Sequence, residues 1–148
     1  RDLMPPRFLM RPLLNGGTLG RPSERFLLAF ELSEYGEVVR LPNVDIVVVE
    51  DAKVRDYLLS PTHPVGRFKS VFFIALGFSP DRWEALRDAL LDLARTGDAV
   101  PGQASPFGLK FEIHATLLGP SGRQANVVTV WMVSNGQDFP HFITAHPG

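Results

Sequence analysis

The residues LKFEIHATLL at positions 109 to 118 give the plainest indication of the architecture. Apolar side chains alternate with polar ones from 109 to 117, which is the period of two expected of a strand with one face in a core and the other in solvent. Two further strand-like runs follow, ANVVTVWMV at 125 to 133 and FPHFITA at 139 to 145. Because the short, turn-rich segments GPSGR and SNGQD join these runs, the sequence predicts an antiparallel meander.

Helical periodicity precedes this predicted sheet, across a predicted loop at 98 to 108. We predict a short helix capped by Asp51, a second helix that begins near Pro64, and a third that starts after Ser79 and ends at Gly97. The second helix is expected to bury an apolar stripe made of Val65, Phe68, Phe72, Ala75 and Leu76. The predicted fold class is therefore α+β, with helices followed by an antiparallel β-meander.

The N-terminal part of the chain is less regular. Residues 1 to 23 end in the linker-like stretch NGGTLGRPS, so we expect a flexible or partner-packed arm followed by a single α+β domain over residues 24 to 148. Segments 25 to 32 and 37 to 41 flank SEYG and are compatible with an N-terminal β-hairpin, although a run such as FLLAF is also typical of a short buried helix. The β-branched residues at 45 to 49 predict a buried strand or an extended lead-in.

Composition narrows the classes of function. The 148 residues are 45% hydrophobic, enough for one core, and the net charge of -1 creates no global field toward nucleic acid. Cysteine is absent, which excludes disulfides and a cysteine nucleophile and fits a cytoplasmic protein. No run approaches the roughly 20 apolar residues of a membrane helix, so no membrane association is expected. The histidines are scattered and no nucleotide-loop motif occurs, so neither a metal site nor a cofactor is expected.

The segment SPTHPVGRFKSVFF at 60 to 73 is the first candidate site. It places His63, Arg67 and Lys69 at a predicted helix N-terminus, whose free backbone N–H groups and partial positive charge suit an anion such as a phosphate. A histidine in that position can act as a general acid or base near neutral pH. The alternative is structural: His63 caps the helix, Gly66 allows close packing, and both cations are solvated.

The polar face of the predicted sheet is the second candidate site. Lys110, Glu112 and His114 share one strand face, and Thr129 adds a hydroxyl from the next strand. Metal-independent ribonucleases position a phosphodiester on surfaces of this kind, with proton transfer by His, Glu or Lys and charge stabilisation by Arg or Lys. Arg123, in the GPSGR turn, offers a further phosphate contact. The alternative is an ordinary solvent face with cross-strand pairs.

Several uncommon sequence segments carry a resemblance to a known family. LPN, KVRDYLLSPTHPVGRFKSVFF, GLKFEI, LLGPSGR, VVTVW and FITAHP all lie between Leu41 and the C-terminus. Over residues 41 to 148 the chain resembles a bacterial family of unknown function with an HPxGRxK motif. The resemblance implies a toxin-like protein, often encoded beside a small barrel-like partner in an arrangement like a toxin and antitoxin. Phe111 and His146 depart from the family pattern, because tyrosines are expected at both positions.

The order of helices before an antiparallel meander also resembles the barnase and RelE-like ribonucleases. That resemblance implies an active site on a sheet face. The candidate set is then catalytic His63, Lys69 and Arg67, with substrate-binding Lys110, Thr129 and Arg123.

These observations lead to hypotheses from different classes of function. The first is a toxin-like domain that cleaves RNA without a metal: a base removes the ribose 2′-OH proton while cations stabilise the phosphorane. Its partners would be RNA and a small antitoxin-like protein. The alternative is a non-catalytic module that binds a protein through the sheet face or the N-terminal arm, and the arm is also a candidate for homodimerisation. Convergence of His63, Arg67, Lys69 and Lys110 in one cleft would favour the enzyme, whereas their scattering over the surface would favour the module.

Overall fold

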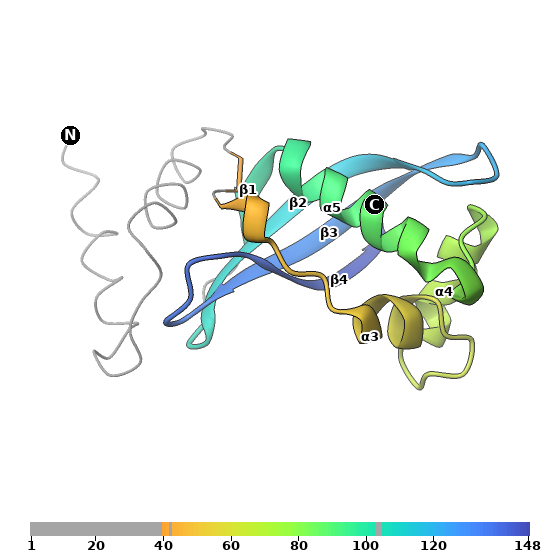
Figure 1. Ribbon diagram of the computed structural model, residues 1–148, viewed down its shortest axis with the longest axis horizontal. Coiled ribbons are helices and arrows are strands. Elements are labelled where there is room, and N and C mark those ends of the chain that lie inside the picture. The colour runs from red at the N-terminus through yellow and green to blue at the C-terminus, as the bar shows by residue number, and fades with distance from the viewer. Residues whose placement is uncertain (1–39, 42, 103–104) are drawn as a thin grey trace.

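The structure is a computed structural model that describes residues 40, 41, 43–102 and 105–148. The expected arm at 1 to 23, with its expected role in homodimerisation, and most of the expected hairpin lie outside the described residues. Within the described part, three α-helices precede a four-stranded antiparallel sheet, which confirms the predicted α+β class (Figure 1).

The helical elements come first in the chain. They are η1 (Val44–Ile46), α3 (Asp51–Lys53), the π-helical turn η2 (Val54–Leu58), α4 (Arg67–Ala75), η3 (Pro80–Arg82) and α5 (Trp83–Thr96). The strands are β1 (Ala99–Pro101), β2 (Gly108–Leu118), β3 (Gln124–Ser134) and β4 (His141–Pro147), and they lie in that order across the sheet.

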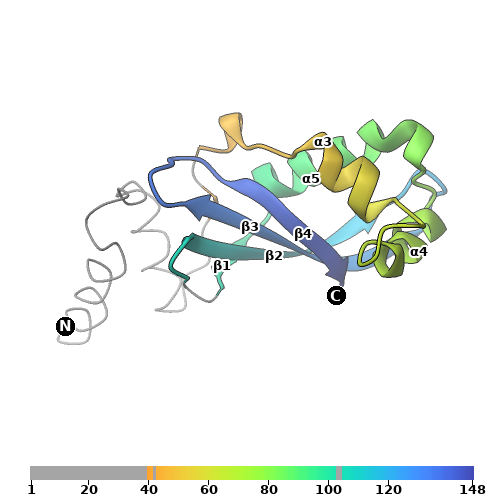
Figure 2. The same ribbon diagram turned by 90° about the horizontal axis from the view of Figure 1, so that it is seen from below.

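The elements form two layers, with α5 lying across one face of the sheet (Figure 2). Leu86, Leu90 and Ala94 recur at every fourth position of α5 and are fully buried, as the predicted amphipathic period requires. They share one core with Phe111 and Trp131 of the sheet. No described helix covers the opposite face of the sheet (Figure 2).

β2 and β3 pair along their whole length, from Gly108 opposite Ser134 to Leu118 opposite Gln124. The pairing of β4 with β3 shifts at a β-bulge between Val130 and Trp131. A bulge bends the strand and increases its local twist. The bulge therefore bends β4, which is an outer strand of the sheet.

β1 is a strand that the sequence pattern did not indicate, because residues 98 to 108 were expected to form a loop. Ala99 pairs with Ile113 and is fully buried, while Pro101 ends the strand opposite Phe111. A run of three residues that ends in proline is too short to show a period of two.

The segment before α3 also differs from the simple strand that was one expectation. Val44–Ile46 form a 3-10 turn, and Val48 makes a single parallel bridge to His141. The Val48 N–H donates to the oxygen of Pro140 at 3.1 Å, and the Phe142 N–H donates to the oxygen of Val48 at 2.9 Å. This bridge holds the start of α3 against the outer edge of β4.

α4 buries a different face from the one predicted. Ser70, Phe73 and Leu76 are buried, whereas Phe68 and Val71 are each 71% exposed. Because almost every residue from 71 to 76 is apolar, the pattern does not distinguish one face from the next.

The phase of α4 is set by a contact far away in sequence. The backbone N–H and the hydroxyl of Ser121, in the β2–β3 turn, both donate to the oxygen of Leu76, at 3.2 Å and 2.8 Å. The predicted stripe was right for Leu76 and in part for Phe72, which packs against the core. It was wrong for Val65, Phe68 and Ala75, which face solvent.

Candidate functional site

An open groove of about 620 Å³ lies along the outer edge of β4. It forms where the segment of α3 and η2 meets the loop before α4 and the edge strand. We call it the edge groove, and its lining residues are Glu50, Ala52, Lys53, Tyr57, His63, Val65, Ile143 and Thr144.

Side-chain contacts hold the walls of the edge groove together. The Lys53 ammonium donates to the oxygen of Ile143 at 3.2 Å, and the hydroxyls of Tyr57 and Thr144 lie 3.4 Å apart. The ring of His63 stands edge-on to that of Tyr57, with centroids 5.1 Å apart. Gly66 makes this packing possible, because a Cβ at that position would overlap the backbone of Tyr57. The expected close-packing role of Gly66 thus has a definite partner.

His63 takes the helix-capping position that was the structural alternative. Its Nδ1 accepts the N–H of Val65 at 3.0 Å and that of Gly66 at 2.9 Å. A neutral imidazole that accepts at Nδ1 carries its proton on Nε2. In this arrangement the ring lining the groove is a hydrogen-bond donor at Nε2, and the geometry does not favour a role as general base.

A carboxylate and an ammonium flank His141 near one end of the edge groove. Burial lowers the pKa of His141 below its usual range, the Glu50 carboxylate opposes that shift, and the Lys53 ammonium adds to it. Glu50 and Lys53 therefore both influence the pKa of His141, and both line the edge groove.

Arg67 and Lys69 do not line the edge groove. Arg67 is exposed, donates to the oxygen of Pro64 at 2.5 Å, and lies over the ring of Phe68 at 4.3 Å. Lys69, two residues further along α4, is partly buried. The structure thus separates both cations of the HPxGRxK motif from the groove that holds its histidine.

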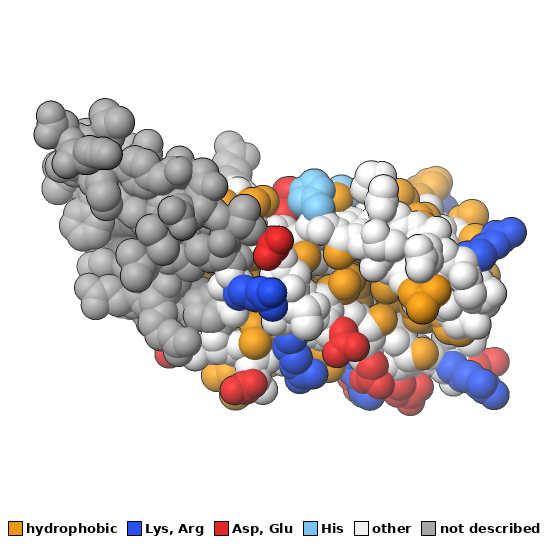
Figure 3. Space-filling model, turned by 90° about the horizontal axis from the view of Figure 1, so that it is seen from above, with side chains coloured by type: hydrophobic (Ala, Val, Ile, Leu, Met, Phe, Trp, Pro, Cys, Tyr) orange, Lys and Arg blue, Asp and Glu red, His pale blue; other side chains and the backbone are white. Residues whose placement is uncertain are grey.

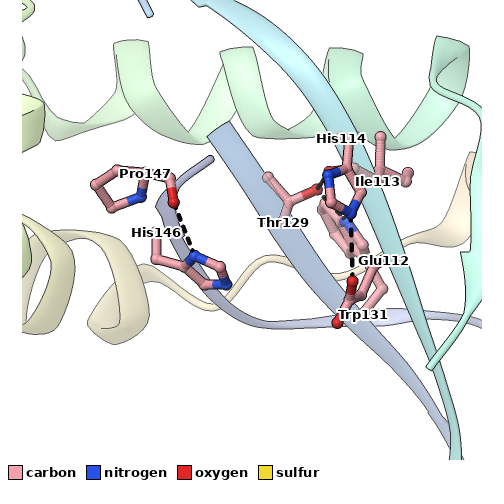
Figure 4. Close-up of polar contacts among 7 residues, drawn as sticks. All are labelled: Glu112, Ile113, His114, Thr129, Trp131, His146 and Pro147. Carbon is pink, nitrogen blue, oxygen red and sulfur yellow. Dashed lines mark hydrogen bonds and ion pairs between the residues drawn. The ribbon is translucent and has the colours of Figure 1, made fainter. Parts of the chain in front are cut away.

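The polar side chains of β2 lie on the uncovered side of the sheet, as expected. We call this surface the open face, defined by Lys110, Glu112, His114 and Thr116. The imidazole of His114 lies 3.3 Å from the Glu112 carboxylate (Figure 4). His146 of β4 stands two strands away in the same cross-strand row, since His114 pairs with Val128 and Val128 pairs with His146. A smaller hollow of about 270 Å³ borders His114 and Thr116.

Thr129 does not lie on the open face, so that expectation was wrong. Its side chain is fully buried, donates to the oxygen of Ile113 at 3.3 Å and accepts the indole N–H of Trp131 at 2.8 Å (Figure 4). The register explains this placement, because Thr129 lies between Ile113 and Ala145 on the core side. Thr129 supports Trp131 and has no access to a substrate.

Arg123 is exposed at the β2–β3 turn, where it was expected. It lines a different hollow, of about 500 Å³, together with residues at the end of α4. His63 in the edge groove, Lys110 on the open face and Arg123 beside α4 thus lie in three different places, so these candidates do not converge in one cleft.

Sequence reasoning did not single out Glu50, Lys53 or Tyr57. Lys53 and Tyr57 stand four residues apart, which places them on one side of a helix. That spacing was a usable signal for those two residues. Their meeting with Thr144 depends on the Val48 bridge and the β4 bulge, neither of which local sequence specifies.

None of the described helices is long and apolar enough to cross a membrane. Across the ranges that the structure describes, no group of three or more histidine or carboxylate side chains is placed to hold a metal ion. The edge groove itself contributes one carboxylate, Glu50, and one imidazole, His63.

Comparison with known proteins places the chain in a family. Residues 40–148 match the family described as Domain of unknown function (DUF6883). The chain belongs to this family. The match confirms the resemblance to a family of unknown function over nearly the expected residues. No curated protein matches this DUF6883 chain.

A solved structure shares the fold of this DUF6883 domain. It is a contact-dependent growth inhibition toxin - immunity protein complex from Klebsiella pneumoniae 342, and the similarity to one of its chains has a TM-score of 0.55 at 19% sequence identity. The alignment covers 68% of this chain and 99% of that chain. At this identity the similarity concerns the fold.

Proposed function

We propose that this DUF6883 domain is a toxin-like domain that cleaves RNA in the edge groove by a mechanism that needs no metal ion. The observation that carries the proposal is the composition of the groove. The side chains of Glu50, Lys53, Tyr57 and His63 line one hollow and supply a carboxylate, an ammonium, a phenol and an imidazole. The Nδ1 of that imidazole accepts two backbone N–H groups. These side chains suffice for proton transfer and for stabilising charge on a phosphoryl group.

The proposed reaction is an internal transfer within the RNA. The Glu50 carboxylate removes the proton of a ribose 2′-OH, and the 2′-oxygen attacks the adjacent phosphorus. The bond from phosphorus to the 5′-oxygen breaks, the Tyr57 hydroxyl protonates that oxygen, and solvent later returns the proton from Glu50 to Tyr57. The products are a 2′,3′-cyclic phosphate and a 5′-hydroxyl end.

Charge stabilisation in this scheme comes from Lys53 and His63. The ammonium and the Nε2–H donate to the non-bridging oxygens, where negative charge builds up. Because the chain has a net charge of -1, RNA affinity must come from local cations. Arg67 and Lys69 on α4 and Lys110 on the open face are the proposed contacts for phosphates that flank the scissile bond.

The test is RNA cleavage by the purified chain in EDTA, with identification of the product ends. We expect Glu50→Gln and Lys53→Met each to lower the cleavage rate by about 100-fold or more. His114→Asn, on the open face, is the matched control and should keep the wild-type rate. Loss of cleavage in the control alone would move the reaction to the open face. Absence of cleavage by the wild type across structured and unstructured RNAs would overturn the proposal.

A non-catalytic interaction module is the second candidate function, and a separate observation favours it. α4 presents Phe68 and Val71 to solvent, and large apolar patches mark protein interaction sites. The structural neighbour is itself a toxin–immunity protein complex, which supports a protein partner for this domain. The two candidates are compatible if the partner regulates the edge groove.

A further inference from the structure

We propose that the outer face of α4, together with the β2–β3 turn, is a docking site for a protein partner that presents acidic residues around an apolar projection. α4 lies at the end of the molecule beside that turn (Figures 1 and 2). We call this surface the α4 face, and its apolar residues are Val65, Phe68, Val71 and Ile74.

The apolar part of the α4 face is continuous. Phe68, Val71 and Ile74 follow one another at intervals of three along the helix, and their side chains are 71%, 71% and 42% exposed. Neighbours at this spacing lie on one side of a helix. Single exposed apolar residues need no explanation, but a contiguous row of them marks a binding surface.

A preformed hollow adjoins this row. About 500 Å³ of space lies between α4 and the β2–β3 turn, lined by Val71, Phe72, Ala75, Leu76, Arg123, Gln124 and Ala125. The two walls are fixed to each other, because Ser121 donates two hydrogen bonds to the oxygen of Leu76. A projecting apolar side chain of a partner can enter such a hollow without rearranging it, which is how interface hot spots are built.

The charge around the α4 face indicates the charge of the partner that would bind there. Arg67 lies over the ring of Phe68 and Arg123 lines the hollow, and the sequence has no Asp or Glu from 57 to 80 or from 113 to 137. Acidic side chains gather instead mainly along the helix side of the molecule, the lower edge of Figure 3. An apolar surface with cations beside it is complementary to an apolar surface with an acidic rim.

The α4 face is contiguous with the edge groove. Val65 is 55% exposed at the start of α4 and also lines the groove beside His63. A partner seated on α4 would therefore border the groove and obstruct the entry of RNA. This inhibitory consequence rests on the proposed function, whereas the docking site itself does not.

The test uses two synthetic amphipathic helical peptides and the full-length ¹⁵N-labelled chain. Both peptides carry leucines at positions i, i+3, i+4 and i+7, and they differ only in having glutamate or lysine at the remaining positions. We expect the glutamate peptide to shift the amide resonances of α4 and the β2–β3 turn, and to bind at least about tenfold more tightly than the lysine peptide. Phe68→Ser with Val71→Ser should weaken binding about tenfold.

Phe107→Ser is the matched control, since Phe107 is 74% exposed outside the α4 face and its replacement should leave binding unchanged. Equal binding of both peptides, or resonance shifts centred elsewhere, would overturn the proposal. So would a dimer in sedimentation that dissociates in the Phe68, Val71 double variant, because the occupant would then be a second copy. Cleavage assays with and without the glutamate peptide test inhibition separately, so a domain without nuclease activity leaves the docking result interpretable.

Discussion

The ring of His63 accepts two backbone N–H groups at Nδ1, so its Nε2–H is the donor that it offers to the edge groove. One side chain thus fixes the start of the helical segment and lines the edge groove. Thr129 is a comparable case inside the core, where one hydroxyl joins the backbone of Ile113 to the indole of Trp131. A pair of substitutions at His63 and another at Thr129 test these roles.

His63→Ala should lower the free energy of unfolding by about 1 kcal/mol, the usual cost of losing a helix-capping acceptor. His63→Asn should restore most of that stability, because an amide oxygen can accept the same N–H groups. Urea unfolding curves of the three proteins give the comparison. In the RNA assay both variants should be slow, because neither retains the imidazole Nε2–H. If His63→Asn cleaved RNA at the wild-type rate, His63 would act only as a helix cap.

Thr129→Val should destabilise the domain by roughly 1–3 kcal/mol, because it leaves the buried N–H of Trp131 without an acceptor. Thr129→Ser keeps the hydroxyl and should recover most of the loss. Thermal or urea unfolding measures both values. If Thr129→Val were as stable as the wild type, the hydroxyl would have no structural role.

The elements of the fold differ in how far sequence specifies them. α5 and the meander were predictable, because Leu86 and Leu90 recur at helical spacing and 109 to 117 alternates strictly. The phase of α4 was not predictable, since both of its faces are apolar and a turn more than forty residues later in the chain fixes it. The edge groove escaped sequence reasoning for the same reason, because Tyr57 and Thr144 meet only through tertiary contacts.

Two phenylalanines test the phase of α4 directly. Phe73→Ala should cost about 3–5 kcal/mol, because the ring is fully buried. Phe68→Ala should change the free energy of unfolding by less than about 0.5 kcal/mol, because the ring is mostly exposed. Urea unfolding measures the loss of stability in both variants. A larger loss in Phe68→Ala than in Phe73→Ala would support the buried helix face that was predicted from sequence.

The edge of β4 carries a pH dependence through His141. Burial lowers its pKa in the folded state, so the unfolded chain binds the proton more readily. Stability should therefore fall as the pH drops through the ordinary histidine value of about 6.5. His141→Gln cannot take up a proton and should show a shallower decline between pH 8 and pH 5 in urea unfolding. An unchanged slope in the variant would mean that His141 titrates normally in the folded protein.

The edge groove, the open face and the α4 face lie on different parts of the molecule, and Val65 joins the first to the third. The edge groove lies along β4, the open face lies across the strands, and the α4 face lies at the end of the molecule beside the β2–β3 turn. The chain belongs to the DUF6883 family and shares its fold with a chain of a toxin–immunity protein complex. The choice of the edge groove as the RNA site rests on the side chains that this chain brings there.

An NMR titration tests that choice most directly. The ¹⁵N-labelled protein would be titrated in EDTA with an RNA oligonucleotide whose 2′-hydroxyls are methylated, so that binding occurs without cleavage. The largest amide shifts are predicted along the edge groove, at Lys53, Tyr57 and His63, with smaller shifts on α4. Shifts centred on Glu112 and His114 of the open face, or no shifts at all, would contradict the account.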